Sequence, residues 1–446
     1  MSVIATDKRT LVVGLGVTGL SCVRFLHGQG RRFAVADSRS TPPGLDILRR
    51  DYPDVPLYLG DFSADVFSRF DELVVSPGIS VHTPAIQAAR EAGARISGDI
   101  DLFSQVAGAP IVGITGSNGK STVTTLLGEM AKAAGIHVAV GGNLGVPALD
   151  LLSPDVELYI LELSSFQLET TECLGALAAT VLNVSDDHMD RYASRLEYFQ
   201  AKQRIFNGCR EAIVNLDDPL SQPLARDTLG MRFFGFGRVN PATFGTRREG
   251  DVLWITHGFE NLLRTDELRL RGTHNIANVM AALALGEAAG LPMGVMLDVA
   301  RRFEGLPHRC QPVRTLDGVE YINDSKGTNV GATVAAIESL VPHAGRLVLI
   351  AGGDGKGADF APLAKPVART CRGVVLFGRD ARPLADALSG ACALSFADSL
   401  EDAVQQARAQ AQPGDTVLLS PACASLDMFR NYEERGLRFA QAVEAL

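Results

Sequence analysis

Two glycine-rich segments each follow a short apolar run, and both have the spacing of phosphate-binding loops. The first spans Gly14–Gly19 in the pattern GxGxxG, and the next apolar run, RFAVAD, ends in Asp37. Such glycines let the backbone approach a diphosphate, while the acid can bind ribose hydroxyls. NAD satisfies this pattern, and a UDP-linked sugar satisfies it equally well. The alternative is that the glycines serve only a tight turn and helix packing.

The second segment, TGSNGKS, ends in Lys120 and Ser121 and follows the apolar run APIVGI. Successive backbone N–H groups in such a loop surround phosphates, the lysine neutralises their oxygens, and the hydroxyl can bind Mg²⁺. The general pattern has glycine where Ile114 stands, so this is a variant loop with Gly116 inside it. We predict that it binds ATP.

Candidate cation ligands follow two further apolar runs. Glu162 ends the run YILE, a position from which a carboxylate can reach the loop's Mg²⁺; a solvated acid is the alternative. His188 lies among acids in NVSDDHMDRY and is a candidate for a second cation site, with Asp187 orienting it, although a lone histidine is more often structural. Composition alone predicts that Lys202, in YFQAKQRIF, is a solvent-exposed lysine on a helix.

Side-chain amides and one further turn could complete these sites. Asn143 lies beside flexible glycines, and Asn275 and Asn278 share one face of a predicted helix over 275–287, where both could face a purine. Helix capping would explain Asn275 alone equally well. The turn Ser76–Gly78 ends another predicted strand, and could line the first site or be a plain proline–glycine turn.

The elements that must position these groups alternate regularly. Short Val/Ile/Leu runs, glycine turns and helix-length amphipathic stretches predict an α/β protein with largely parallel sheets. We expect three domains: a Rossmann-like N-terminal domain, a central P-loop ATPase domain with a mainly parallel sheet, and a Rossmann-like C-terminal domain. Their expected ranges are 1–97, 98–306 and 307–446.

Composition excludes several protein classes. The 446 residues are 46% hydrophobic and 21% charged, which rules out disordered and collagen-like chains. A net charge of −9 argues against a general nucleic-acid or membrane-surface binder, without excluding an anionic ligand. Seven dispersed cysteines without a CxxC pair predict reduced thiols, and we see neither a signal peptide nor a membrane-length apolar run. We therefore expect a cytoplasmic, monomeric enzyme or binder of small molecules.

Taken together, these motifs resemble the Mur ligase family of ATP-dependent amino-acid-adding enzymes. TGSNGKST, ELSSFQL, DHMDRY, GTHNIANVMAA, GLPHR and INDSKGTN occur in the family's order and cover the second and third segments almost end to end. GLGVTGLS, DSR, SPGI, GGDGKGADF and SPACASLDMFRNYEERG are similar to members that add D-glutamate. The DNPR sequence typical of members that add diaminopimelate or lysine is absent.

The resemblance implies a role for each matching residue. It implies that the UDP substrate is bound by Gly14, Leu15, Gly16, Thr18, Gly19, Asp37, Ser38, Arg39, Ser76, Pro77 and Gly78. It implies that ATP is bound by Gly116, Ser117, Asn118, Gly119, Lys120, Ser121, Asn143, Asn275, Asn278, Arg309 and Asp324. D-Glutamate would be bound by His188, Thr328, Lys356, Ser425 and Tyr432; relatives often carry phenylalanine at the last position. Two Mg²⁺ ions would be held by Ser121, Glu162, His188 and a CO₂-carbamylated Lys202. Lys326 would lie near the reacting acyl phosphate.

The implied reaction activates the carboxylate of UDP-N-acetylmuramoyl-L-alanine with ATP. The resulting acyl phosphate is attacked by the amine of D-glutamate, a step in making a peptidoglycan precursor. A folate-polyglutamate type of ligase would share the central motifs but not the GxGxxG/DSR opening. A nicotinamide oxidoreductase would leave the second phosphate loop unexplained, and a non-enzymatic nucleotide-binding regulator would leave the cation ligands without a use.

Overall fold

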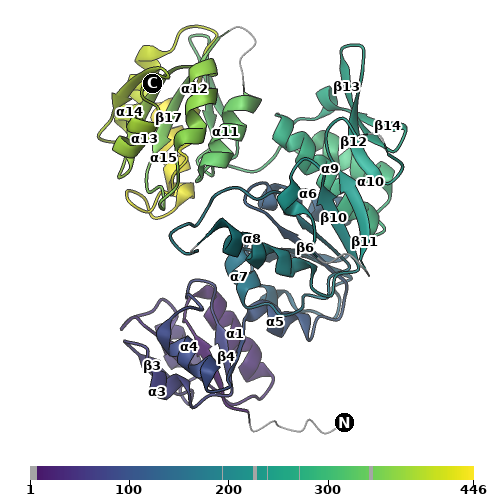
Figure 1. The fold of residues 1–446 in the computed structure, drawn as a ribbon, viewed down its shortest axis with the longest axis vertical. Helices are drawn as coiled ribbons and strands as arrows, with labels where there is room; N and C mark the ends of the chain where they lie inside the picture. The colour runs from purple at the N-terminus through teal and green to yellow at the C-terminus, as the bar shows by residue number, and fades with distance from the viewer. Residues whose placement is uncertain (1–7, 193, 225–228, 239, 271, 341–344) are drawn as a thin grey trace.

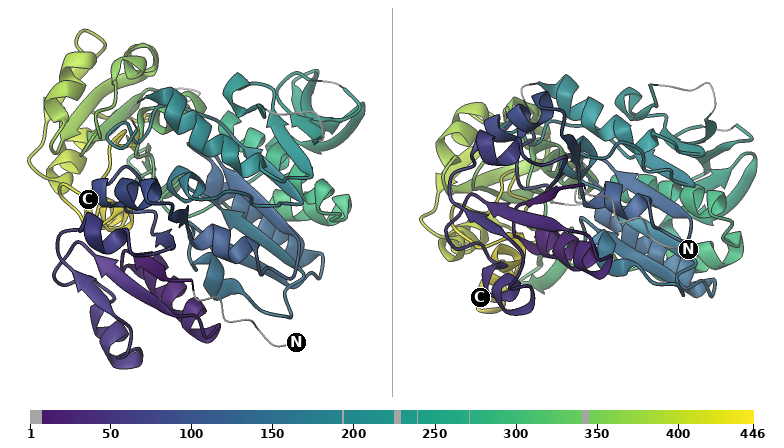
Figure 2. Two further views of the ribbon diagram at one scale, coloured as in Figure 1. Left: turned by 60° about the horizontal axis from the view of Figure 1, so that its bottom comes forward. Right: turned by 90° about the horizontal axis from the view of Figure 1, so that it is seen from below.

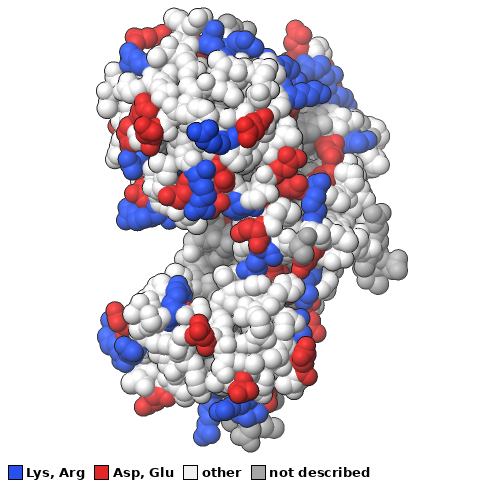
Figure 3. All heavy atoms as spheres, turned by 60° about the vertical axis from the view of Figure 1, so that its left-hand side comes forward, with Lys and Arg blue, Asp and Glu red and all other residues white. Residues whose placement is uncertain are grey.

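Three α/β bodies make up the protein, each built on its own sheet (Figure 1). The computed structural model describes residues 8–192, 194–224, 229–238, 240–270, 272–340 and 345–446. Figures 1 and 2 show the first and third bodies on the same side of the central body, with a space between them. The space-filling view shows a deep notch between the first and third bodies (Figure 3). In this described part, no helix is both long and apolar enough to cross a membrane.

The first body has a five-stranded, all-parallel sheet in the order β3-β2-β1-β4-β5. Its strands are β1 Thr10–Val13, β2 Phe33–Asp37, β3 Leu57–Leu59, β4 Glu72–Val75 and β5 Arg95–Ser97. Its helices are α1 Val17–Gly28, α2 Leu45–Asp51, α3 Ala64–Phe67, α4 Pro84–Glu91 and α5 Asp99–Ser104. Every residue of β1 is buried, because Val12 packs on the α1 side of the sheet and its neighbours Leu11 and Val13 pack on the α3/α4 side.

The central body has nine strands in the order β14-β13-β12-β11-β10-β9-β6-β8-β7, parallel except for the antiparallel pairs β12–β13 and β13–β14. They are β6 Ile111–Thr115, β7 Val138–Gly142, β8 Leu158–Glu162, β9 Ala178–Val181, β10 Glu211–Asn215, β11 Gly230–Phe234, β12 Thr243–Glu249, β13 Val252–His257 and β14 Glu260–Arg264. The helices are α6 Lys120–Ala133, α7 Ser165–Glu169, α8 Arg195–Gln203, α9 Thr273–Ala288 and α10 Met293–Arg302. Buried residues of α6 and α9 join the sheet in one core.

The third body has six strands in the order β15-β16-β20-β17-β18-β19, with β15 as an antiparallel edge strand. They are β15 Gln311–Leu316, β16 Val319–Asn323, β17 Leu347–Gly352, β18 Cys371–Phe377, β19 Ala393–Phe396 and β20 Thr416–Leu419. The helices are α11 Val330–Ser339, α12 Ala364–Thr370, α13 Ala381–Ala387, α14 Leu400–Gln410 and α15 Tyr432–Glu444. Short 3₁₀ turns elsewhere in the chain cover Ala148–Leu151, Arg204–Phe206, Pro219–Ser221, Thr265–Glu267 and Ala361–Leu363.

This architecture confirms the predicted α/β class with three bodies and mainly parallel sheets. The exact domain limits at 97 and 306 stay predictions. In the first body the strand order reverses at β1 and β4, and in parallel sheets ligands bind where the carboxyl ends of such strands leave a crevice. Both predicted phosphate loops begin at the carboxyl end of a parallel strand, β1 and β6.

Candidate functional site

The glycines of the first loop are required by close contacts. Gly14 has φ +98°, a backbone conformation that favours glycine, and accepts a hydrogen bond on its carbonyl from the Ser76 hydroxyl at 3.2 Å. A Cβ on Gly19 would lie 1.9 Å from the Gly14 carbonyl oxygen. The glycines are therefore needed for a tight turn and close helix packing. This structural role is compatible with a phosphate bound at the same loop.

Alanine at position 19 should destabilise the first body. Its methyl group would meet backbone, which cannot rotate away, and such overpacking lowers the free energy of unfolding by about 1–3 kcal/mol. Gly28→Ala, at the end of the same helix, is the matched control, because a Cβ there meets nothing within 4 Å. Denaturant unfolding of both variants checks this; equal stability of the two would contradict it.

Asp37 holds this loop in place through hydrogen bonds. Its carboxylate accepts hydrogen bonds from the Leu15 N–H at 2.7 Å and from the Arg39 N–H, Nε and Nη2 at 2.9, 2.8 and 2.7 Å. Burial opposes the charged form, but these donors outweigh it and lower the pKa of Asp37. Both carboxylate oxygens are thus already bonded within the chain, so Asp37 positions the loop and Arg39 at the rim of the pocket.

A pocket of about 470 Å³, here the first-body pocket, lies over this loop and the turn at 76–79. It is lined by Gly14, Gly16, Val17, Thr18, Asp37, Ser38, Arg39, Ser76, Pro77, Gly78 and Ile79. The structure therefore gathers the residues predicted for the UDP substrate except Leu15 and Gly19, which do not line the pocket: the Leu15 N–H donates to Asp37, and Gly19 lies against the Gly14 carbonyl. Two apolar lining residues, Ile79 and Val17, were not among the predicted site residues; Val17 is 69% exposed.

The second loop has the geometry of a phosphate cradle. Gly116 has φ +151° and Gly119 has φ +84°, and Gly119 is the N-cap of the fourteen-residue helix α6. The free N–H groups and dipole of such a helix start favour anions. Lys120 donates from Nζ to the carbonyls of Gly116 and Ser117 at 2.8 and 2.9 Å, and burial lowers its pKa.

Glu162 lies beside this loop at the end of β8, the neighbour of β6. Its side chain is buried; Oε1 accepts from the Asn143 amide at 2.7 Å, and Oε2 has no hydrogen-bond partner among the described residues. A buried carboxylate oxygen that accepts no hydrogen bond is suited to binding a cation. Carboxylate oxygens are ligands that Mg²⁺ prefers. The Ser121 hydroxyl accepts from Arg309 Nη2 at 2.7 Å.

A cavity of about 280 Å³, here the phosphate-loop cavity, opens in front of Lys120 and Asn143. His188 lines it with φ +57°, and burial lowers its pKa to about 4, so the imidazole is neutral, as a metal ligand must be. Within the described ranges, no three His, Cys, Asp or Glu side chains form a metal cluster by themselves.

Lys202 lies on the wall of the same cavity, so the interpretation of a solvated helix lysine was wrong. Its side chain is 1% exposed, donates from Nζ to the Gly116 carbonyl at 3.0 Å and lies 4.5 Å from the centre of the Tyr198 ring. Burial, followed by the charge of Lys120, lowers the pKa of Lys202 well below its ordinary value. A neutral amine is the form that reacts with CO₂, so this environment fits a carbamate.

The third body contributes positively charged side chains, Lys326 and Lys356, to the wall of this cavity. Lys356 Nζ lies 3.1 Å from Asp187 Oδ1, and Thr328 and Lys326 line the same cavity. Lys326 lies 3.9 Å from the centre of the Tyr432 ring, and burial lowers its pKa to about 8. Of the residues predicted for D-glutamate, His188, Thr328 and Lys356 are brought together. Ser425 is buried, and neither it nor Tyr432 lines the cavity.

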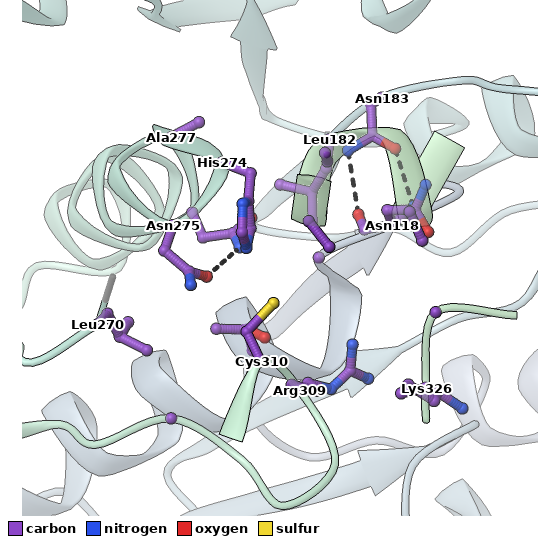
Figure 4. Close-up of a pocket in the computed structure, with 18 of the residues that line it drawn as sticks. Asn118, Leu182, Asn183, Leu270, His274, Asn275, Ala277, Arg309, Cys310 and Lys326 are labelled. Atoms are coloured by element: carbon purple, nitrogen blue, oxygen red, sulfur yellow. Dashed lines mark hydrogen bonds between the residues drawn. The ribbon is translucent and has the colours of Figure 1, made fainter. Parts of the chain in front are cut away.

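A third cavity of about 160 Å³ lies between the central and third bodies (Figure 4). Asn275 and Asn278 line it together, with Asn278 Nδ2 donating to Asn275 Oδ1 at 3.0 Å. The interpretation of Asn275 as a helix cap was wrong, because the N-cap of α9 is Gly272 and Asn275 lies within the first turn of the helix. Asp324 also lines this cavity, and burial raises the pKa of its carboxyl group to about 6.

Several lining residues were missed. His274 lines the third cavity next to Asn275, and Asn183 exchanges two hydrogen bonds with the backbone of Asn118 at 2.8 and 3.0 Å (Figure 4). Asn329, the N-cap of α11, donates to Asp187 at 3.1 Å across the bodies. Asparagines at strand and helix ends are common turn residues, so the sequence offered little to single these out.

Comparisons with known proteins cover the whole chain. Three family models match in succession: "Mur ligase MurD-like, N-terminal domain" over residues 8–98, "Mur ligase middle domain" over 114–286 and "Mur ligase, glutamate ligase domain" over 308–423. A UDP-N-acetylmuramoylalanine–D-glutamate ligase of Marinobacter nauticus is 68% identical over 446 residues, covering 100% of both chains. A protein of the same name from Pseudomonas aeruginosa is 56% identical over 447 residues, again covering 100% of both.

Solved structures show the same fold at much lower identity. A pseudomurein peptide ligase type C from Methanothermus fervidus superposes with a TM-score of 0.64 at 18% identity, covering 98% of this chain and 100% of that one. A UDP-N-acetylmuramate–alanine ligase from Thermotoga maritima gives a TM-score of 0.60 at 17% identity, with the same coverage. At these identities the likeness bears on the fold alone.

Proposed function

This chain belongs to the Mur ligase family, and we propose that it joins D-glutamate to UDP-N-acetylmuramoyl-L-alanine with ATP, forming ADP and phosphate. The full-length likeness to ligases of that name supports the choice of substrates. One observation on the structure carries the chemistry. Lys120 of the phosphate loop, His188 and Lys356 of the third body face one cavity, where a carboxylate, ATP and an amine can meet. We place this activity in the cytoplasm, in a monomer.

The first-body pocket would hold the UDP part of the substrate. The loop at Gly14–Gly19 offers backbone N–H groups to a diphosphate, and Arg39, held by Asp37, supplies a cation at the rim. The turn at 76–79, which lies against Gly14, lines the same pocket. The other end of the substrate then extends toward the central body.

ATP would span the phosphate-loop cavity and the third cavity. Its phosphates would lie on the α6 N-terminus with Lys120, and its base would lie against Asn275 and Asn278. Arg309, which already reaches the loop at Ser121, would contact the γ-phosphate. Ser121 and Glu162 would hold one Mg²⁺, and His188 with a carbamylated Lys202 the second. When bound, these ions offset the repulsion between an anionic nucleophile and a polyphosphate.

The protein's own contribution is alignment and exclusion of water. The first body presents the carboxylate, the central body presents the γ-phosphate, and the third body brings Lys326, Lys356 and the amine. Holding reactants at contact replaces an encounter in solution and removes much of its entropic cost. Closure of the third body over the cavity keeps water from the acyl phosphate, and Lys326 offers a positive charge to the leaving phosphate.

Substrate choice tests this function directly. With ATP and UDP-N-acetylmuramoyl-L-alanine, phosphate release is expected to require D-glutamate, while L-glutamate and lysine should leave the rate at background. A coupled phosphate assay measures this, with omission of the UDP substrate as control. Release that ignores D-glutamate would refute the proposal. A nicotinamide absorbance change without ATP would instead favour an oxidoreductase.

A further inference from the structure

Arg191 joins the central body to the wall of the first-body pocket. Its Nη1 donates to the Pro77 carbonyl at 3.1 Å, and its Nη2 donates to the Ile79 carbonyl at 3.1 Å. The same Nη2 lies 2.8 Å from Glu169 Oε2 on α7. Pro77 and Ile79 both line the first-body pocket, so this guanidinium holds one wall of that pocket from outside.

Arg191 also contacts residues that line the phosphate-loop cavity. Its guanidinium carbon lies 4.4 Å from the centre of the Phe166 ring, and the Phe166 ring meets the His188 ring edge-on at 4.7 Å. The Arg191 N–H also donates to the His188 carbonyl at 2.9 Å. Phe166 and His188 line the phosphate-loop cavity. A continuous set of contacts therefore runs from one cavity wall to the other.

This contact set is rigid for physical reasons. The Arg191 side chain is 14% exposed, so its hydrogen bonds compete little with water, and Glu169 neutralises the buried charge. A planar guanidinium can donate to two carbonyls in fixed directions, which a lysine ammonium cannot reproduce. The turn itself is fixed on its other side, because the Ser76 hydroxyl donates to the Gly14 carbonyl at 3.2 Å.

We propose that Arg191 is a positioning residue that sets the distance and orientation between the first-body pocket and the phosphate-loop cavity. The inference deepens the proposed function and rests on it, because a substrate anchored by its UDP end must present its carboxylate in the second cavity. Arg191 contacts neither reacting group in this role. A misplacement of about 1 Å at a distance from the chemistry can cost about 10²-fold in rate.

The matched control is another arginine that joins the same two bodies. Arg24 on α1 donates from Nε to Asp150 of the central body at 3.1 Å and forms an ion pair with it at 2.5 Å. Neither Arg24 nor Asp150 lines the cavities described above. Arg24→Ala therefore removes an interbody tether without touching the pocket wall.

The test compares Arg191→Ala, Arg191→Lys and Arg24→Ala. We expect Arg191→Ala to lower kcat about 10–100-fold and to raise the calorimetric Kd of the UDP substrate several-fold, with the Kd of ATP unchanged. Arg191→Lys keeps the charge beside Glu169, which guards against simple misfolding, and should retain most of the defect. Millimolar guanidinium should partly restore the alanine variant, because it can refill the space between Pro77, Ile79 and Phe166.

Two results would overturn this role. An Arg191→Ala protein no worse than Arg24→Ala would make the contact a generic tether. Equal losses for ATP and UDP-substrate binding, without guanidinium rescue, would mean general damage to the fold. If the unaltered protein shows no D-glutamate-dependent turnover, the proposed function fails, and the calorimetric comparison of UDP-substrate and ATP binding still decides the role of Arg191.

Discussion

Replacing Lys120 with alanine is expected to lower kcat/KM for ATP about 10²–10³-fold, the usual cost of removing one group that stabilises transition-state charge. Lys120 begins α6 inside the phosphate loop. Its side chain is half-buried, and the charges of Glu162 and Asp187 oppose the lowering of its pKa by desolvation. No exposed lysine can replace a cation at that position. Phosphate release under saturating D-glutamate and UDP substrate measures the loss.

The same variant should bind the UDP substrate normally. The first-body pocket is lined by residues 14, 16–18, 37–39 and 76–79, whereas Lys120 lines the phosphate-loop cavity and donates to the Gly116 and Ser117 carbonyls. Lys132→Ala is the matched control, because Lys132 lies in the last turn of the same helix, exposed and paired with Glu129. Calorimetry should give the same UDP-substrate Kd for both variants. Lost UDP binding in Lys120→Ala would contradict the assignment of the two substrates to separate bodies.

Much of the fold could be predicted because parallel α/β structure leaves strong local signals. Strands such as β1 and β8 are short, mainly apolar runs in which every residue is buried, since helices or neighbouring elements cover both faces. The antiparallel strands β12–β14 were not anticipated. Charged and apolar residues mix in them, as in TFGTRRE, because this end of the sheet is partly exposed and its pattern is weak.

The loops of the candidate site were also predictable, since phosphate-binding backbone demands glycine at fixed places. Gly119 shows why: its φ of +84° lies in the left-handed region, which residues with a Cβ rarely adopt. Residues that act through long-range contacts were not predictable. Arg191 reads as an ordinary charged residue in DHMDRY, and only the folded chain brings it to Pro77, 114 positions away. Lys202 was misjudged from composition because burial depends on partners distant in sequence.

Lys202→Ala is the second change with a large expected effect. A carbamate forms when a neutral amine attacks CO₂ and loses a proton, and it turns a cation into an anion. Lys202 is prepared for this, because burial and the neighbouring charge of Lys120 lower its pKa. An anion there would join the His188 imidazole as a ligand for the second Mg²⁺ that we propose for the phosphate-loop cavity. Losing it should lower kcat about 10²–10³-fold, the equivalent of several kcal/mol of charge stabilisation.

Rescue by small molecules separates this role from a structural one. Acetate or formate can enter the space left by the Lys202 side chain and supply a carboxylate, so either should restore part of the kcat of Lys202→Ala. Neither should help Lys120→Ala, which lacks a cation, and neither should alter Lys132→Ala. The unaltered protein should also lose activity when dissolved CO₂ is removed and regain it with bicarbonate. If carboxylates restored Lys202→Ala and Lys120→Ala equally, or restored neither, Lys202 would act as a cation or a packing residue, and the carbamate would have to be abandoned.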